Sequence, residues 1–301
     1  MEKTRKMKPL AKQKPHKHFL KRRRANYSIG GDLFNLIVLL AFAAFMVLPL
    51  IYAICQSLKP NEEIFVFPPT FFVRNPTFDN FVDVVILMGQ SWVPFSRYIL
   101  NSVFVTVVGT LGHIIFASMA AYVLEKHKFP GRNAIFAMIV TSLMFSAHVT
   151  GIPNYIIMSK LGWIDTYLAL IVPAFAYSFG LYLMKQFMSQ VPDVMIEAAR
   201  IDGASEFRIF RQIVMPSVKP AWLTLMIFQV QSLWGSPAGN YIYSEEMKML
   251  PNALREIISA GISRAGAGAA VTVIIMLGPI TVFVINQSNV MQTMATSGMK
   301  E

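Results

Sequence analysis

The chain has 301 residues, of which 54% are hydrophobic and 14% are charged, and its mean hydropathy is +0.50. A soluble domain carries about 25% charged residues, so this composition excludes an ordinary soluble protein and indicates a membrane protein. The single cysteine, Cys55, excludes an internal disulfide framework and a cysteine-based zinc site. We interpret Cys55 as a small buried apolar residue.

The net charge of +11 comes mainly from the start of the chain, where every charged residue except Glu2 is basic up to Arg24. A basic arm can bind nucleic acid, but this one precedes a long apolar run. We therefore interpret residues 1–30 as a cytoplasmic tail that contacts anionic lipid, and we expect no nucleic-acid partner. The apolar run is too long for a signal peptide and is expected to remain as a membrane helix.

Apolar runs long enough to cross a hydrocarbon core of about 30 Å recur along the chain. The predicted fold is an all-α membrane protein with six transmembrane helices. The predicted spans are 33–57, 98–123, 134–158, 166–187, 220–234 and 269–287. Gln229, Gln231 and Ser232 interrupt the fifth run, and polar residues within a span usually face other helices or an aqueous path.

The distribution of basic residues predicts that both termini are cytoplasmic, and the N-terminal arm supplies most of this evidence. We divide the chain into the arm, a first span with its outer loop over 31–96, a core over 97–290 and a cytoplasmic tail over 291–301. The outer segments are expected to contain short helices over 81–88 and 253–260.

Motifs for catalysis are absent from the sequence: it has no phosphate-binding loop, no zinc-binding helix and no nucleophile with its base. We therefore predict no catalytic residue and no metal site. His113 and His148 fall within predicted spans, and we interpret them as neutral side chains hydrogen-bonded to neighbouring helices. Small residues in the second span predict a close helix contact; they are Gly109, Gly112, Ala117, Ala120 and Ala121.

A polar segment over 192–220 lies between two apolar runs. Pro192 can start a short helix, and Asp202-Gly203 is a predicted break, because glycine tolerates positive φ and aspartate can cap the next helix. That second helix is predicted over 204–214, before Pro216 and Pro220 stop it. Its expected apolar stripe is formed by Phe207, Phe210 and Val214.

Such a helical hairpin suits docking into a groove of a partner protein, although an amphipathic helix lying on lipid has the same periodicity. The segment also carries a spaced pattern: Glu-Ala-Ala, three residues, Gly, nine residues, Ile, two residues, Pro. The residues in this register are Glu197, Ala198, Ala199, Gly203, Ile213 and Pro216.

The pattern closely resembles the EAA loop of the membrane subunits of ATP-binding-cassette importers, with Met215 where leucine is usual. The resemblance extends over about 97–287 and is to the shorter permease of maltose-type carbohydrate importers. It implies a type I importer permease architecture with a cytoplasmic coupling helix, in a bacterial or archaeal cytoplasmic membrane. Two departures are the lack of a proline near Phe145-Ser146 and a divergent C-terminal tail.

The resemblance implies that the loop contacts the ATPase and that Glu197 pairs with a basic residue there. The implied coupling residues are Glu197, Ala198, Ala199, Asp202, Gly203, Ala204, Phe207 and Pro216. The implied partners are a second homologous permease, an ATPase dimer and an extracytoplasmic sugar-binding protein. No cofactor is expected in this chain, because ATP and Mg²⁺ would bind to the ATPase.

The leading hypothesis is therefore an importer permease for a sugar, with an oligosaccharide as the expected substrate. The candidate residues for the substrate path are Gln229, Gln231, Ser232 and Trp234. Three alternatives are a permease for a non-sugar solute, an ATP-independent transporter and a membrane scaffold. An ATP-independent transporter predicts carboxylates within the spans, and a scaffold would not require the break at Gly203 and the stop at Pro216.

Overall fold

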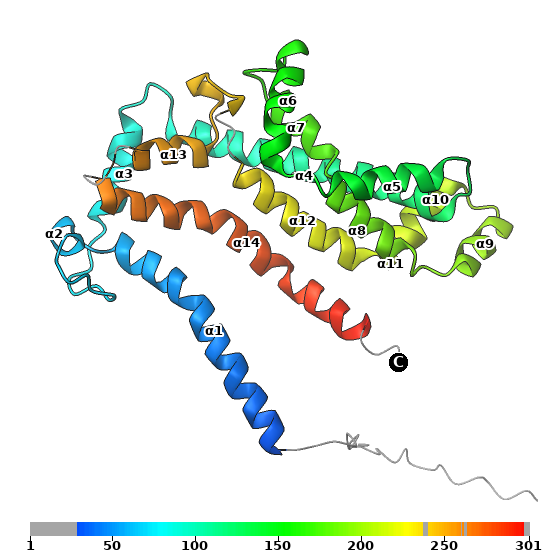
Figure 1. Cartoon of the computed structure of the whole chain (residues 1–301), viewed down its shortest axis with the longest axis horizontal. Helices are drawn as coiled ribbons and strands as arrows, with labels where there is room; N and C mark the ends of the chain where they lie inside the picture. The colour runs from blue at the N-terminus through cyan, green and yellow to red at the C-terminus, as the bar shows by residue number, and fades with distance from the viewer. Residues whose placement is uncertain (1–28, 237–239, 260, 262–263, 298–301) are drawn as a thin grey trace, which may run out of the picture. The chain divides into compact units, whose positions relative to one another are not determined.

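The computed structural model describes residues 29–236, 240–259, 261 and 264–297. The chain divides into two compact units, Met1–Leu50 and Ile51–Glu301. Every regular element in the described ranges is helical, which confirms the predicted all-α class (Figure 1). The basic arm up to residue 28 and residues 298–301 lie outside the described ranges, so the expectations for them stay predictions.

Four helical segments among the described residues are long and apolar enough to cross a membrane. They are α1 (Ile29–Ser57), α4 (Phe95–Lys126), α7 (Leu168–Phe175) together with α8 (Ser178–Met188), and α14 (Ala265–Ser297). A fifth arises if α12 (Lys219–Trp234) is joined to the preceding helical segment 206–217, from which it is bent by 78°. The described residues therefore support four or five spans, and the predicted total of six stays a prediction.

The predicted continuous span over 134–158 is wrong. The chain forms α5 (Arg132–Ser142) and α6 (Ala147–Lys160), which are separated by a turn. In this turn the backbone N–H groups of Leu143, Met144 and Phe145 donate to carbonyls three residues earlier, at 3.0–3.3 Å. Such bonds tighten the end of a helix. The interruption thus forms without the proline that is usual near this position, and neither helix is long enough to cross a membrane alone.

Short helices form most of the remaining segments of the second unit. Helix α3 (Asp79–Gly89) confirms the helix predicted over 81–88, and α13 (Leu250–Ser259) confirms the one predicted over 253–260. They pack with the start of α14 around the first turns of α4 (Figure 1). Tyr98 and Leu254 are fully buried there. The smaller elements nearby are α2 (Asn61–Ile64) and the 3₁₀ turn η3 (Glu245–Met247).

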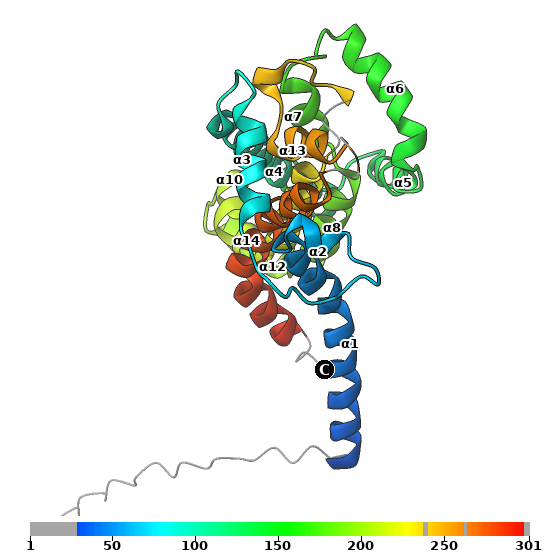
Figure 2. The same ribbon diagram turned by 90° about the vertical axis from the view of Figure 1, so that its left-hand side faces the viewer.

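Helix α4 is the central element of the second unit, because α7, α8 and α12 all pack against it (Figure 2). Its glycines allow close approach: a Cβ on Gly109 would lie 2.6 Å from Leu233 Cδ1, and one on Gly112 would lie 2.1 Å from Phe175 Cε1. Ala117 and Ala121 are also buried. The predicted small-residue contact is therefore confirmed at these four positions, whereas Ala120 is only half-buried.

Candidate functional site

The 192–220 loop folds into short helices that lie beside the C-terminal end of α4, at Lys126 (Figure 1). Helix α9 (Asp193–Ile201) starts directly after Pro192, as predicted, and it buries Ile196. Gly203 follows with φ of 77°, in the left-handed region that glycine occupies without steric cost. The predicted helix start and the predicted break are both confirmed.

Two details of the second helix differ from the prediction. Asp202 is the C-terminal cap of α9, and its backbone N–H donates to Ala198. The N-cap of α10 (Glu206–Ile209) is Ser205, whose hydroxyl accepts from the N–H of Arg208. The helix therefore begins at Glu206 and not at residue 204. Ser205 takes this role because its extended backbone directs the hydroxyl toward the first turn, while the chain is still turning at Asp202.

A π-helical turn, η1 (Phe210–Val214), follows α10 and changes which residues share a face. Ile209 and Val214 are both fully buried although they are five residues apart. An i→i+5 turn aligns such positions, whereas an α-helix would not. The predicted stripe was expected to be exposed for docking, and Phe207 agrees with this because it is 64% exposed. The stripe does not continue as predicted, because Phe210 is half-buried and Val214 is buried.

The prolines of the loop begin helices and do not stop them. Pro216 lies in the first turn of α11 (Met215–Ser217), and Pro220 lies in the first turn of α12. Proline is tolerated there because first-turn N–H groups have no partner within the helix. The break falls between them at Val218, whose backbone leaves the helical region (φ −100°, ψ 22°).

One face of the loop packs firmly on the membrane helices. Its buried residues Ile196, Ile209 and Val214 join a cluster formed by the ends of α4, α8 and α12. The cluster also contains Ala121, Tyr122, Met184, Met188, Val191, Val218, Ala221 and Leu225. Burying this apolar surface stabilises the attachment by about 25 cal/mol per Å². The loop is therefore fixed to three helices of the second unit.

The opposite face of the loop is exposed and partly apolar. Val194, Ile201 and Phe207 are 74%, 87% and 64% exposed. Of the predicted coupling residues, Glu197, Ala198, Asp202, Gly203, Phe207 and Pro216 are exposed, and Ala199 and Ala204 are half-buried. Large apolar side chains that stay exposed beside charged groups are typical of interaction surfaces.

An ion pair also connects the loop to α4. The Lys126 ammonium lies 2.7 Å from the Asp193 carboxylate and donates to the Val191 carbonyl at 2.6 Å. The hydrogen bond from Lys126 holds the pKa of Asp193 below its usual value. Because Asp193 is mostly exposed, this pair mainly orients the first turn of α9.

A cavity of about 730 Å³ lies among α5, α6, α7 and α12. Gln229 and Ser232 line it, which brings together two of the four predicted path residues. Gln229 is 2% exposed, its amide N–H donates to the Ala174 carbonyl at 3.2 Å, and its Oε1 has no partner among the described residues. Sequence patterns did not indicate the other polar lining residues, which include Ser142, Asn154, Tyr177, Ser178, Ser236 and Tyr241.

The other two predicted path residues do not line the cavity. Gln231 is exposed on the surface and is not a lining residue of the cavity. The Trp234 indole donates to the Ile275 carbonyl of α14 at 2.9 Å, and its ring lies against Gly278, where a Cβ would approach within 2.5 Å. Trp234 therefore fixes α12 to α14.

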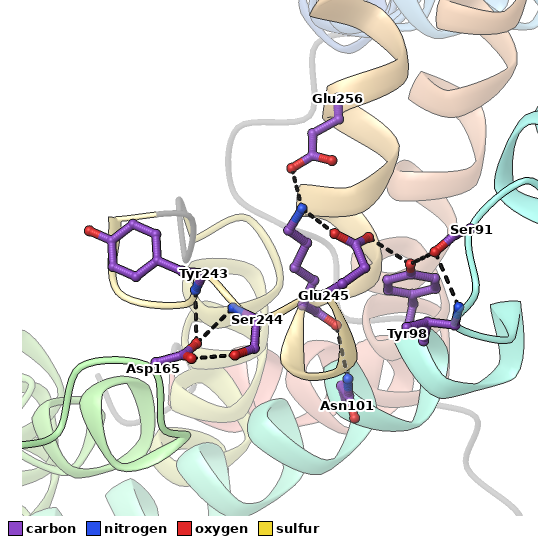
Figure 3. Close-up of polar contacts among 10 residues, drawn as sticks. Ser91, Tyr98, Asn101, Asp165, Tyr243, Ser244, Glu245 and Glu256 are labelled. Atoms are coloured by element: carbon purple, nitrogen blue, oxygen red, sulfur yellow. Dashed lines mark hydrogen bonds and ion pairs between the residues drawn. The ribbon is translucent and has the colours of Figure 1, made fainter.

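The segment from Tyr243 to Lys248 is held by polar contacts from α4 and from the turn before α7 (Figure 3). Asp165 accepts hydrogen bonds from the N–H groups of Tyr243 and Ser244, at 2.9 and 2.8 Å, and from the Ser244 hydroxyl. The Ser244 bonds hold the pKa of Asp165 below its usual value. Asp165 itself has a φ of 61°, which aspartate tolerates better than most residues.

A chain of ionic contacts continues from this segment to α13. Burial raises the pKa of Glu245, but hydrogen bonds from Lys248 and Tyr98 outweigh burial and hold it below its usual value. The Lys248 ammonium lies 2.5 Å from Glu245 and 2.7 Å from Glu256 (Figure 3). Asn101 donates to the carbonyls of Glu246 and Lys248, at 2.8 and 3.0 Å. These contacts fix the segment to the start of α4.

The histidines fit the interpretation as far as they are described. His113 is buried, and its Nδ1 lies 3.1 Å from the Phe175 carbonyl, at the point where α7 ends. The side chain of His148 lies outside the described residues. Cys55 is a free, half-buried cysteine. Among the residues that the structure describes, no group of three or more metal-ligating side chains lies close together.

The sequence of residues 113–294 matches the family described as binding-protein-dependent transport system inner membrane component. The chain belongs to this family. The permease is thus the membrane component of a transport system, as the resemblance of its 192–220 loop implied. Membership also agrees with the multi-pass membrane character of the helices.

Two curated relatives are similar to the permease over about two thirds of its length. Protein LplC of Bacillus subtilis is 35% identical over 208 residues, which cover 67% of the permease and 66% of LplC. The arabinooligosaccharides transport system permease protein AraQ of Halalkalibacterium halodurans is 30% identical over 232 residues, which cover 73% of the permease and 79% of AraQ.

Two solved structures share the fold. A bacterial ABC transporter involved in the import of the acidic polysaccharide alginate matches with a TM-score of 0.73 and 24% identity, over 88% of the permease and 99% of that chain. A bacterial alginate ABC transporter in complex with an alginate pentasaccharide-bound periplasmic protein matches with a TM-score of 0.56 and 14% identity, over 85% and 95%. At these identities the likeness shows the fold alone.

Proposed function

We propose that the permease is one subunit of an ATP-driven importer that moves a sugar, and specifically an oligosaccharide, across the cytoplasmic membrane. The observation that carries this proposal is the two-sided 192–220 loop. One face is buried against α4, α8 and α12, and the other leaves charged and apolar side chains exposed. A partner that moves this loop would move three membrane helices with it.

The proposed partner at the exposed face is an ATP-binding-cassette ATPase dimer, which would bind ATP and Mg²⁺. Glu197 would pair with a basic residue of that subunit, and Ile201 and Phe207 would enter its groove, as amphipathic helices do. Gly203 would allow the sharp bend between α9 and α10. This assignment places the loop and both termini in the cytoplasm.

The remaining proposed partners are a second homologous permease, an extracytoplasmic sugar-binding protein and membrane lipid, without nucleic acid. The family description supports a binding-protein-dependent system. The periplasmic protein bound to the alginate transporter in the second solved structure supports the same arrangement. The exposed apolar residues along α4, α5 and α6 supply surface for the second permease and for lipid.

We place the substrate path at the cavity lined by Gln229 and Ser232. Sugars offer hydroxyl groups to polar side chains and apolar ring faces to aromatic ones, and the cavity combines such amide, hydroxyl and aromatic groups. The oligosaccharide class is supported by the names of AraQ and of the alginate transporters. A path shared with a second permease would enlarge this cavity.

The test compares Gly203→Asp with the matched variant Gly162→Asp in co-purification from detergent. Both glycines have positive φ, 77° and 68°, and neither has an atom within 4 Å of an added Cβ, so the backbone strain is similar. We expect wild type and Gly162→Asp to recover a second permease and an ATPase, and Gly203→Asp to lose the ATPase. Recovery of the chain alone from wild type would refute the proposal.

Uptake of labelled oligosaccharides in cells provides the second measurement. Glu197→Ala removes an exposed carboxylate, so we expect insertion into the membrane to be unchanged and uptake to be abolished. Normal uptake by this variant would refute the role of Glu197 in coupling.

A further inference from the structure

A second connection between α4 and the 192–220 loop centres on Glu206. Its carboxylate accepts a hydrogen bond from the Tyr122 hydroxyl at 2.8 Å through one oxygen. Its other oxygen accepts from Arg200 Nε at 2.7 Å. Tyr122 belongs to α4, Arg200 to α9 and Glu206 to the first turn of α10. One carboxylate therefore joins three helices.

The Tyr122 side chain is suited to such a connection because it is 5% exposed and cannot turn away to solvent. Its ring contacts the Phe210 ring at a centroid distance of 5.4 Å and the His127 ring at 5.3 Å. His127 Nε2 also lies 3.5 Å from Glu206. Tyr122 thus contacts α10 through its hydroxyl and the π turn through its ring.

Glu206 and Arg200 lie on opposite sides of the turn between α9 and α10. Gly203 and its neighbours form the turn between α9 and α10. Arg200 lies before this turn and Glu206 lies after it, so the Arg200–Glu206 pair closes the turn. The pair is 41% and 48% exposed, so its own contribution to stability is small. The connection is fixed at α4 by Tyr122, whose buried side chain donates its hydroxyl to Glu206.

We infer that Glu206 is a positioning residue that transmits displacement of the α9–α10 turn to α4 through Tyr122. This inference rests on the proposed function, since it describes how the same loop moves the membrane helices. Glu206 is not among the residues assigned to ATPase contact, because its carboxylate binds Tyr122 and Arg200 of its own chain.

The test uses Tyr122→Phe, which removes only the hydroxyl, and Glu206→Ala, alone and together. The matched control is Glu256→Ala, since Glu256 also accepts from one basic side chain at 2.7 Å but lies in α13. Each variant is assembled with its co-purified subunits in liposomes, and sugar moved per ATP hydrolysed is measured per assembled complex. A purely structural role would lower the amount of complex and leave this ratio unchanged.

We expect Tyr122→Phe and Glu206→Ala each to lower the ratio by about fivefold or more, in the range of ordinary coupling energies. The double variant should equal the single ones, because both remove the same connection. Glu206→Gln retains an accepting oxygen and should recover part of the ratio. Unchanged ratios in Tyr122→Phe and Glu206→Ala, or fully additive losses, would overturn the inference.

A readout without transport separates this inference from the proposed function. Trypsin cleaves after exposed arginine residues, so Arg200 and Arg208 are expected cleavage sites in the detergent-solubilised chain. Loss of a hydrogen bond to a charged group should accelerate this cleavage about tenfold in Tyr122→Phe. If wild type shows no ATP-driven transport, the proposed function fails, and cleavage at the wild-type rate in Tyr122→Phe then overturns the inference independently.

Discussion

Gly112 lies where α4 packs against the last residue of α7, and Gly112→Ala tests that contact. A Cβ there would lie 2.1, 2.7 and 2.7 Å from three atoms of the Phe175 ring. The ring is held on another side by Phe116, at a centroid distance of 5.2 Å. Overpacking of this kind costs about 1–3 kcal/mol. Replacing a helical glycine by alanine returns about 1 kcal/mol, so the net destabilisation should reach about 2 kcal/mol.

Gly151→Ala is the matched control, because Gly151 lies within α6 and no atom lies within 4 Å of the position that an added Cβ would take. Gly151→Ala should therefore stabilise the protein by about 1 kcal/mol, because only the gain in helix propensity applies there. Thermal unfolding of both detergent-purified variants, followed by circular dichroism, measures the difference. Equal shifts in the same direction would refute the close approach of α4 and α7.

Three further predictions concern single side chains. Gln229→Leu should lower sugar uptake and change stability by about 1 kcal/mol, because the lost bond to the Ala174 carbonyl is partly offset by removal of a buried oxygen without a described partner. Gln231→Leu should leave uptake unchanged, and the reverse ranking would move the path away from the cavity. Ser205→Ala should destabilise α10 by about 1 kcal/mol, detected as faster amide exchange over 206–209; exchange at the wild-type rate would contradict the cap. The lowered pKa of Asp165 means that its stabilisation of the Tyr243–Ser244 segment is present above the usual pKa of about 4 and is lost as pH falls through the lowered folded value. Asp165→Asn should therefore make that segment sensitive to proteolysis at neutral pH, as low pH should do in the wild type. Proteolysis of the wild-type segment that does not change at low pH would contradict this prediction.

Sequence analysis located two residues with strong local backbone preferences well, although it misjudged Pro216 and Pro220, which begin helices. Pro192 and Gly203 mark the start of α9 and the turn after it, because ring closure and the missing Cβ act whatever the surroundings. Short helices were also predicted over 81–88 and 253–260, where α3 and α13 form. The small residues of α4 predicted its close contacts, since only they admit the neighbouring side chains.

The features that were missed depend on contacts between distant residues. Leu143, Met144 and Phe145 are apolar, so hydropathy gives no sign of the break between α5 and α6. The Ser142 hydroxyl contacts Ser178 of α8 at 2.7 Å, a contact that no local pattern indicates. Gln229 and Trp234 were equal candidates by sequence, and only the packing of α12 separates the cavity side from the α14 side.

The π turn over Phe210–Val214 has a consequence for exchanging loops between related permeases. It holds one residue more than an α-helical turn would need, so a one-residue deletion can be absorbed without breaking the helix. After that deletion Ile209 and Val214 would lie four positions apart in an α-helix, about 40° apart around its axis. Both side chains would therefore still face the buried cluster. A chimera can accordingly lack one residue within this turn and keep the buried face of the loop, even where the residue identities differ.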